Sequence, residues 1–262
     1  MLRFSNLASG SGGNATLIEA CADGDDRVTR VLVDCGLSLR RLTAAMARRG
    51  CTPAQLDAVF VTHEHSDHLG GVPVLQRRLG VAVWCSAGTE ATLDMASPAH
   101  RARDGCGIAI GALELMPFAV PHDAAEPLQL VCRSGSSRLG ILTDLGEPTD
   151  AVVAMLQGCD ALLLECNHDR AMLDAGPYPV WLKRRIGGAR GHLANEQAAT
   201  ILDGCGHAGL RHVVAAHLSQ HNNQPDLALA ALRGALPERP GRCRPQLHVA
   251  APDTGCEWIV LA

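Results

Sequence analysis

The sequence predicts an α/β protein with four layers, in which two sheets pack face to face and helices cover the outer side of each sheet. Short apolar runs alternate with helix-forming segments, and the second half of the chain repeats the first half in outline. Hydrophobic residues make up 47% of the 262 positions, which is enough for a sizeable core. Neither a linker, a charge block nor a low-complexity segment divides the chain, so we expect a single domain over residues 1–262.

The first half is expected to open with a hairpin. A glycine-rich turn at 9–14 leads into the apolar run at 15–18, as is usual where a turn precedes a strand. Ser38 is placed to cap a helix that continues to Arg49, and Gly50 is its stop signal. The other elements expected here are, in order, a strand at 28–34, a strand at 57–62, a helix at 71–78, a strand at 81–85 and a helix at 86–95.

The second half contains the clearest signal of a buried strand. Residues 161–164 are wholly apolar, which is typical of a strand covered on both faces. The elements expected here are, in order, strands at 113–120, 128–132 and 138–143, a helix at 148–157, a strand at 160–165, helices at 169–174, 179–186 and 195–204, a strand at 211–217, a helix at 226–235, and strands at 245–250 and 256–261.

A cluster of potential metal ligands follows the strand at 57–62. Residues 62–68 read Thr-His-Glu-His-Ser-Asp-His, which places His63, His65, Asp67 and His68 within six residues. His63 and His65 alternate and can point the same way from an extended segment, whereas the other two follow a turn and can face a second ion. Imidazoles and carboxylates at this density are typical of a metal site. The loop therefore predicts two metal ions.

The His-x-His-x-Asp-His pattern after a buried strand resembles the signature of the metallo-β-lactamase fold, a superfamily of hydrolases built as an αβ/βα sandwich. The resemblance implies the same four layers that the order of elements predicts. The pattern is specific to the fold and not to the substrate, because members act on lactams, thioesters and phosphodiesters. The substrate has to be inferred from the rest of the chain.

The remaining ligands of a two-metal site should stand at the ends of other strands. His122, Asp144 and His217 each come at the end of an apolar run. By resemblance to the superfamily, they are the third histidine, the bridging aspartate and the last histidine. The resemblance implies that the first metal takes His63, His65 and His122, that the second takes Asp67, His68 and His217, and that Asp144 bridges the two.

Two further positions point to the substrate. Glu165 ends a buried strand, and His192 stands just before a helix whose expected cap is Asn195. This arrangement resembles ribonuclease Z, where a glutamate after the corresponding strand pairs with a histidine that protonates the leaving oxygen. Asn222 and Asn223, together with the glycine-rich turn near the N-terminus, make the chain similar to the YycJ or WalJ-like group of the superfamily, proposed exonucleases.

Charge and aromatic content restrict the partners. The net charge of −4 argues against a protein whose whole surface binds nucleic acid, although a local patch is compatible with it. The basic run at 181–192 is such a candidate, and a solvated helix face is the alternative explanation. Aromatic residues are only 3% of the chain, and Tyr178 and Trp181 beside this run are the obvious platforms for stacking bases.

Composition also bears on location. The start of the chain lacks the long apolar core of a signal peptide, and the apolar runs fall short of the roughly 18 residues of a membrane span. Eleven cysteines are an odd number, are scattered and include no Cys-x-x-Cys pair, so most should be reduced. We therefore expect a cytoplasmic protein without a membrane partner, and the oligomeric state stays open.

These features predict a dinuclear metal-dependent phosphodiesterase, a nuclease of the 5′-to-3′ exonuclease type acting on DNA or RNA. Two divalent ions, zinc before manganese or iron, would provide a hydroxide for in-line attack. Asp67 would orient it, and His192, held by Glu165, would protonate the departing oxygen. Two alternatives are a small-molecule hydrolase of the same fold, either a glyoxalase II-like thioesterase or a small phosphodiesterase, and a metal-free binding module. Glu165 and His192 discriminate against the thioesterase, because a thiolate leaves with little protonation.

Overall fold

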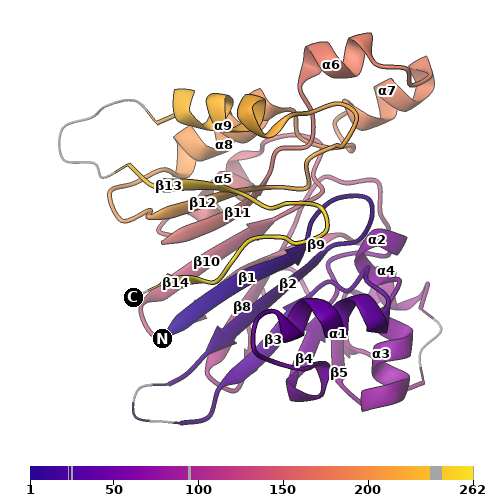
Figure 1. The fold of residues 1–262 in the computed structure, drawn as a ribbon, viewed down its shortest axis with the longest axis vertical. Helices are drawn as coiled ribbons and strands as arrows, with labels where there is room; N and C mark the ends of the chain where they lie inside the picture. The colour runs from indigo at the N-terminus through magenta and orange to yellow at the C-terminus, as the bar shows by residue number, and fades with distance from the viewer. Residues whose placement is uncertain (23, 25, 94–95, 237–243, 262) are drawn as a thin grey trace.

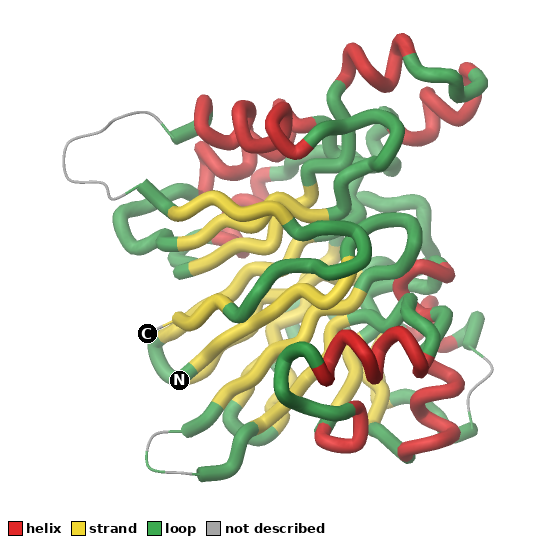
Figure 2. The backbone as a smooth tube through the Cα atoms, viewed as in Figure 1, coloured by secondary structure: helices red, strands yellow, loops and turns green. Residues whose placement is uncertain are grey.

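The described residues of the computed structural model, 1–22, 24, 26–93, 96–236 and 244–261, form two mixed seven-stranded sheets (Figures 1 and 2). The first sheet has the order β14-β1-β2-β3-β4-β5-β6, and the second has the order β13-β12-β11-β10-β9-β8-β7. The strands are β1 (Leu2–Ala8), β2 (Ala15–Ala20), β3 (Thr29–Val33), β4 (Ala58–Phe60), β5 (Ala82–Cys85), β6 (His100–Arg101), β7 (Ile108–Ile110), β8 (Leu113–Ala119), β9 (Leu128–Ser134), β10 (Ser137–Leu142), β11 (Ala161–Glu165), β12 (His212–Ala216), β13 (Gln246–Val249) and β14 (Ile259–Leu261).

Helices cover the outer face of each sheet (Figure 1). The first sheet carries α1 and α3, whose apolar side chains pack on its strands, and the second carries α5, α8 and α9. The helices are α1 (Leu39–Ala47), α2 (Ser66–Leu69), α3 (Val72–Leu79), α4 (Ala87–Glu90), α5 (Asp150–Leu156), α6 (Arg170–Ala175), α7 (Val180–Ile186), α8 (Asn195–Cys205) and α9 (Pro225–Gly234), with a 3₁₀ turn at Pro53–Gln55. The four-layer metallo-β-lactamase sandwich that the sequence predicts is confirmed.

Alternation along the central strands explains why both of their faces are apolar. In β3, Val31 and Val33 enter the core between the sheets, whereas Leu32 packs under the helices of the first sheet. In β11, Leu163 enters the same central core and Leu162 packs under the helices of the second sheet. Because both faces are covered, these strands have continuous apolar runs and not an alternating pattern.

Most predicted elements are confirmed to within a few residues. β1 and β2 pair antiparallel as the expected hairpin, and the hydroxyl of Ser38 accepts a hydrogen bond from the backbone N–H of Arg41 at the start of α1. β1 itself was not predicted from residue 2 onward, because Arg3 and Ser5 interrupt its apolar pattern. Both are accommodated by specific partners, Arg3 by the carboxylate of Glu19 and Ser5 by the guanidinium of Arg49.

The helix expected at 86–95 is the largest error. α4 ends at Glu90, and the last two residues of the predicted helix, 94 and 95, lie outside the described residues. The Glu90 carboxylate accepts hydrogen bonds from the backbone N–H of Ala99 and from Arg101, so the chain returns to the end of this short helix. The short strands β6 and β7 were not predicted, since two or three residues are too few to show periodicity.

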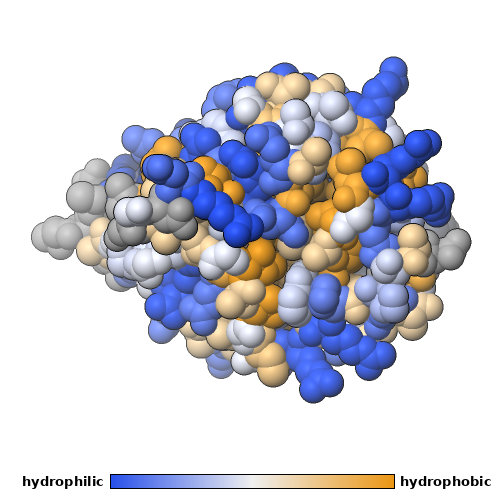
Figure 3. Space-filling view, turned by 90° about the horizontal axis from the view of Figure 1, so that it is seen from below, coloured by the Kyte–Doolittle hydropathy of each residue, from blue (hydrophilic) through white to orange (hydrophobic). Residues whose placement is uncertain are grey.

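Apolar and hydrophilic side chains are mixed on the surface of the protein. In the view from below in Figure 3, apolar side chains lie towards the middle of the face and hydrophilic ones surround them. Apolar atoms contribute much of the surface of any folded protein, so this mixture alone does not mark a binding site. In the described part of the chain, the helices lack the combination of length and apolar content that crossing a bilayer requires.

The parallel strands place several polar residues at one edge. β3 and β4 are parallel neighbours in the first sheet, as are β10, β11 and β12 in the second. The carboxyl ends of parallel strands meet at the same edge of a sheet, which is where ligands usually bind in α/β proteins. The metal loop and most of the other predicted site residues follow these ends directly.

Candidate metal centre

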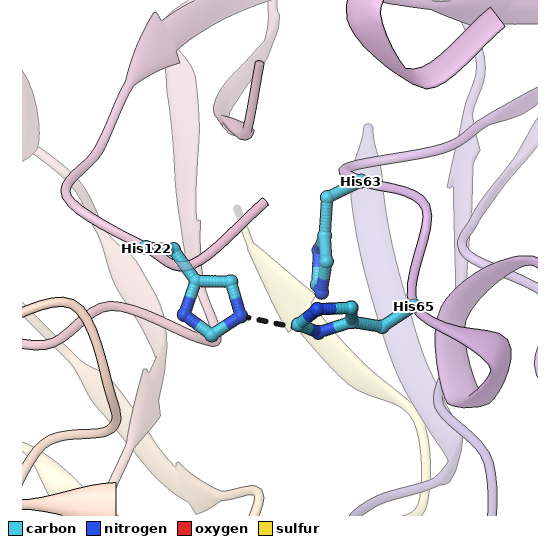
Figure 4. A group of neighbouring side chains, drawn as sticks. All are labelled: His63, His65 and His122. Atoms are coloured by element: carbon cyan, nitrogen blue, oxygen red, sulfur yellow. Dashed lines mark hydrogen bonds between the residues drawn. The ribbon is translucent and has the colours of Figure 1, made fainter. Parts of the chain in front are cut away.

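Three of the predicted ligands form one group of imidazoles. His63 and His65 come from the loop after β4, and His122 comes from the segment after β8 (Figure 4). One ligand atom from each lies within 4.8 Å of the other two, and Nε2 of His122 is 3.3 Å from Nδ1 of His65. Three nitrogen atoms converge on one point, as they do in a tri-histidine metal site.

A second group contains one carboxylate and two imidazoles. Asp67 and His68 lie in α2, and His217 follows β12. Oδ2 of Asp67 is 3.5 Å from Nε2 of His68 and 3.6 Å from Nε2 of His217. The two groups are therefore built from both sheets, and residues distant in the chain meet between them.

Asp144 lies between the two groups. Its Oδ2 is 3.8 Å from Nε2 of His63 and also contacts Nε2 of His68, so one carboxylate reaches a member of each group. Burial raises the pKa of Asp144, but the neighbouring imidazoles of His217 and His68 outweigh burial and keep this pKa well below its usual range. The side chain is an anion in the position that the sequence predicted for a bridging ligand.

The donor atoms fit divalent cations. Nε2 of His63 and Nε2 of His217 are buried, and neither has a hydrogen-bond partner among the residues that the structure describes. Buried polar atoms nearly always have a partner, so two such nitrogens directed into one cluster point to a ligand. Imidazole and carboxylate together suit zinc, manganese and iron. The assignment of individual ligands to each cation stays a prediction.

Three residues at this edge have left-handed backbone conformations. Asp34, Asp144 and His217 have φ angles of 60°, 59° and 55°, and they are the only residues other than glycine with positive φ in the described chain. Each directly follows, or lies one residue beyond, the end of a strand. Such conformations cost free energy and are concentrated at functional sites. The backbone here is thus shaped to direct side chains into the cluster.

Asp34 was missed by the sequence reasoning. Its Oδ2 is 2.8 Å from Nδ1 of His68, and its carboxylate also accepts hydrogen bonds from the backbone N–H and the hydroxyl of Thr62. A carboxylate on the far nitrogen of a histidine fixes the tautomer and turns the other nitrogen towards a metal. The sequence did contain a signal for Asp34, because this residue follows β3 just as the metal loop follows the parallel strand β4.

Similar contacts orient two other imidazoles. Nδ1 of His122 donates to the backbone carbonyl of Gly191 at 3.0 Å, and Nδ1 of His217 lies 3.0 Å from Oε1 of Glu165. In each ring the Nε2 atom is the one left for the cluster. The backbone N–H of His217 donates to the hydroxyl of Ser9, so the glycine-rich N-terminal turn also supports the site.

The predicted pair of Glu165 and His192 is in contact. Nδ1 of His192 is 2.9 Å from Oε1 of Glu165 and equally 2.9 Å from Oδ1 of Asp144. Glu165 is fully buried and also accepts hydrogen bonds from the backbone N–H groups of Leu145 and Leu193. The contact of Glu165 with both His192 and His217 was not predicted, and it connects the pair to the metal cluster.

Opposing effects set the pKa values of this pair. Burial lowers the pKa of His192, but the carboxylates of Glu165 and Asp144 outweigh burial and raise it to about 9. Burial raises the pKa of Glu165, whereas the adjacent His192 lowers it to about 2. The pair is thus a carboxylate and an imidazolium at neutral pH in the metal-free protein.

A cleft of about 470 Å³ gives access to these residues. Besides Asp67, Asp144, His192 and His217, it is lined by Ser11 of the N-terminal turn and by a group from the segment around α7, namely Tyr178, Leu182, Arg185 and Ile186. Arg185 of the basic run is therefore at the site, where its Nε donates to Oδ2 of Asp123 at 2.6 Å. Asp123 was not predicted, although it adjoins His122.

Asn195 is not a helix cap, contrary to the prediction. α8 begins at Asn195 with Ala194 as its N-cap, and the backbone N–H of Ala194 donates to the side chain of Gln197. The Asn195 amide instead exchanges two hydrogen bonds of 2.9 Å with that of Asn223. These bonds fix the segment after His217 against the start of α8, so Asn195 supports the site from behind.

The fold and the cluster together are those of the metallo-β-lactamase superfamily, a class of metal-dependent hydrolases, and the chain belongs to it. The family model described as "Beta-lactamase superfamily domain" matches residues 29–218. Among curated proteins, the chain is 34% identical over 244 residues to "Exodeoxyribonuclease YycJ" of Bacillus anthracis, covering 91% of this chain and 90% of that relative. It is 32% identical over 234 residues to "Exodeoxyribonuclease WalJ" of Streptococcus pneumoniae, covering 86% and 85%.

Solved structures show the same fold at lower identity. The metallo-β-lactamase fold protein YhfI from Bacillus subtilis has a TM-score of 0.70 with 18% identity and covers 97% of this chain and 98% of its own. The short form of human tRNase Z has a TM-score of 0.59 with 16% identity and covers 83% and 93%. These similarities confirm the fold that the sequence predicted.

Proposed function

We propose that this protein is an exodeoxyribonuclease that hydrolyses phosphodiester bonds with two divalent cations. The observation that carries the proposal is His192, which lines the cleft beside the metal cluster and is held by the buried carboxylate of Glu165, a geometry suited to protonating a leaving oxygen. Two relatives that share about a third of their residues with this chain along most of its length bear the name exodeoxyribonuclease.

The ligand sets follow the two groups of side chains. We assign His63, His65 and His122 to one cation and Asp67, His68 and His217 to the other, with Asp144 shared. When bound, two such cations supply a nucleophile from water at neutral pH and neutralise charge on the phosphate. The many imidazoles favour zinc, and manganese and iron are compatible with the same donors.

Asp67 has a further role in this proposal. Its side chain is the most exposed of the second group, at 21%, and it lines the cleft. A carboxylate there can hold one oxygen on the cation and accept a hydrogen bond from the attacking water with the other. Asp67 would thereby direct the nucleophile towards the phosphorus.

His192 completes the reaction at the leaving group. Nδ1 of His192 is held by the carboxylates of Glu165 and Asp144, which leaves Nε2 as the atom that can face the substrate. The alkoxide that leaves a DNA phosphodiester requires a proton, and a positioned general acid contributes about 10²- to 10⁴-fold to the rate. A thiolate would need no such acid, so the pair favours a phosphodiesterase over a thioesterase.

Reconstituted enzyme tests the proposal. Metal-free protein would be loaded with zinc or manganese and incubated with single-stranded DNA carrying a label on the 5′ or the 3′ end, with RNA and with a thioester as competing substrates. We expect mononucleotides to be released from one end of the DNA, and the label that appears first gives the polarity, for which we expect 5′ to 3′. Hydrolysis of the thioester without hydrolysis of DNA would refute the proposal.

A further inference from the structure

We propose that α7 and the turn that follows it, residues 180–190, form a platform that binds unpaired nucleotides of the DNA outside the metal cleft. The inference rests on the proposed function, because it specifies the form of DNA that the same site receives. The platform consists of Trp181 for stacking and of Arg184 and Arg190 for binding phosphates.

α7 is unusually exposed for a helix of this protein. None of its residues is buried, and Val180 and Trp181 are 63% and 66% exposed. α6 and α7 project from the sandwich at one end (Figure 1). A tryptophan this exposed is uncommon, because its large apolar ring is normally covered in the free protein unless it serves recognition.

The two faces of α7 have different surroundings. Leu182, Arg185 and Ile186 face the metal cleft and line it. Trp181 and Arg184 are three residues apart, so they are neighbours on the outer side of the helix. The outer face is therefore separated from the cleft only by the width of a single helix, and a chain that leaves the cleft over α7 would pass Trp181.

Charge on the platform complements phosphate. The side chains of Arg184 and Arg190 are exposed, and neither has a hydrogen bond or an ion pair within the described ranges of the chain. Arg185 and Lys183 differ, because Arg185 pairs with Asp123 and Lys183 donates to the backbone carbonyl of Asp174. Two free cations in the same segment as an exposed indole, in a chain with a net charge of −4, form a local site for a polyanion with aromatic groups.

Backbone contacts fix the position of the platform relative to His192 and Asp144. The backbone carbonyl of Ile186 accepts a hydrogen bond of 2.8 Å from the N–H of His192. The turn packs so closely on Gly146 that a Cβ atom added there would lie 2.2 Å from the carbonyl carbon of Ala189. Since Gly146 is two residues from Asp144, a strand held on the platform has a fixed position relative to the proposed ligands.

Stacking on Trp181 requires an unpaired base. Away from the end of a duplex both faces of each base are covered by its neighbours, whereas a base of a single strand can leave the stack and lie on an indole. Such stacking tolerates any sequence, because every base has an aromatic face. The platform therefore suits the single-stranded part of a DNA molecule, either a free strand or an overhang.

Binding measurements test the inference independently of hydrolysis. The affinity of the metal-loaded protein for a fluorescent phosphorothioate 12-mer would be measured by anisotropy for the wild type, Trp181→Ala and Trp181→Phe. We expect Trp181→Ala to weaken binding of the single strand by about 5- to 140-fold, as is typical when one base–aromatic stack is removed. Trp181→Phe should retain most of the affinity, and Leu79→Ala, which removes an exposed side chain of α3, should bind like the wild type.

The arginines have a charge-matched control. Arg184→Ala with Arg190→Ala should reduce the slope of log affinity against log salt by about 0.7 for each phosphate that the protein no longer neutralises. Arg77→Ala with Arg78→Ala removes the same charge from exposed positions at the end of α3 and should leave the slope unchanged.

Three results would overturn the platform: unchanged affinity in Trp181→Ala, an equal loss for a blunt duplex, or an equal change of slope in the two double variants. Binding that depends on Trp181 but is not followed by hydrolysis of unmodified DNA would instead contradict the proposed function.

Discussion

Replacing His192 by alanine should slow hydrolysis of DNA without removing metal. We assign His192 to neither of the two proposed ligand sets, because its Nδ1 is held by the carboxylates of Glu165 and Asp144 at 2.9 Å. In the proposed mechanism, the variant loses the proton donor for the leaving oxygen. The effect should therefore depend on the leaving group, since an alkoxide needs a proton and p-nitrophenolate leaves without one.

The contacts of Glu165 limit the loss of stability expected in His192→Ala. Glu165 keeps its bonds from Leu145, Leu193 and His217 in the variant, so its buried charge stays satisfied. The stability cost is then limited to about 1.5 to 3 kcal/mol for hydrogen bonding to a charged group. Hydrolysis of DNA should fall by about 10²- to 10⁴-fold, the usual contribution of a general acid. Hydrolysis of a p-nitrophenyl phosphodiester should fall far less.

The assay compares kcat/KM on both substrates and measures metal content on the same samples. His192→Gln is the matched control, because its amide can still donate to Glu165 but cannot serve as an acid at neutral pH. It should resemble the alanine variant in rate and be more stable than that variant, because it keeps a donor to Glu165. Equal losses on both substrates, or loss of metal, would show that His192 is a ligand or a structural residue.

Three further predictions concern the metal cluster and its charges. Asp144→Ala should lose at least one cation per chain and nearly all hydrolysis, and full metal occupancy with ordinary turnover would contradict its bridging position. Asp34→Asn should weaken metal binding by about 10- to 100-fold through its contact with His68, as is usual when the partner of a metal-binding histidine is removed; competition with a chelator measures this, and wild-type affinity would disprove it. In metal-free protein, the folded-state pKa of His192 is about 9 and exceeds the ordinary value of 6.5. The protonated His192 therefore stabilises the fold fully below pH 6.5, and this contribution is lost as pH rises through 9. Thermal melts with chelator should show that Tm falls less between pH 6.5 and 9 in His192→Gln than in the wild type. Parallel curves of Tm against pH would refute the stabilising charge on His192.

The sequence was most informative where residues lie close together in the chain. The candidate ligands at 63–68 and the strands that carry continuous apolar runs could be predicted directly, because local spacing and hydrophobicity determine them. The positions of His122, Asp144 and His217 followed from strand ends together with the resemblance to the superfamily. The structure brings all of these residues to one edge, as that reasoning required.

The missed features depend on tertiary interactions that composition does not reveal. Asp34 supports His68 from 34 residues away, and Asp123 joins Arg185 across 62 residues. The pairing of Asn195 with Asn223 was hidden for the same reason, since a helix-cap signal is local whereas its actual partner is 28 residues distant. A positive φ at Asp144 or His217 is likewise imposed by the tertiary structure, because neither residue type requires it.

Hydrolysis of end-labelled single-stranded DNA as a function of cation equivalents per chain tests the central claim most directly. If the two groups of ligands share Asp144 and act together, metal-free protein should be inactive, and activity should rise until two equivalents are bound and then level off, with mononucleotides as the first products. Saturation at one equivalent, internal cleavage as the first event, or no cleavage of DNA at full occupancy would contradict the account.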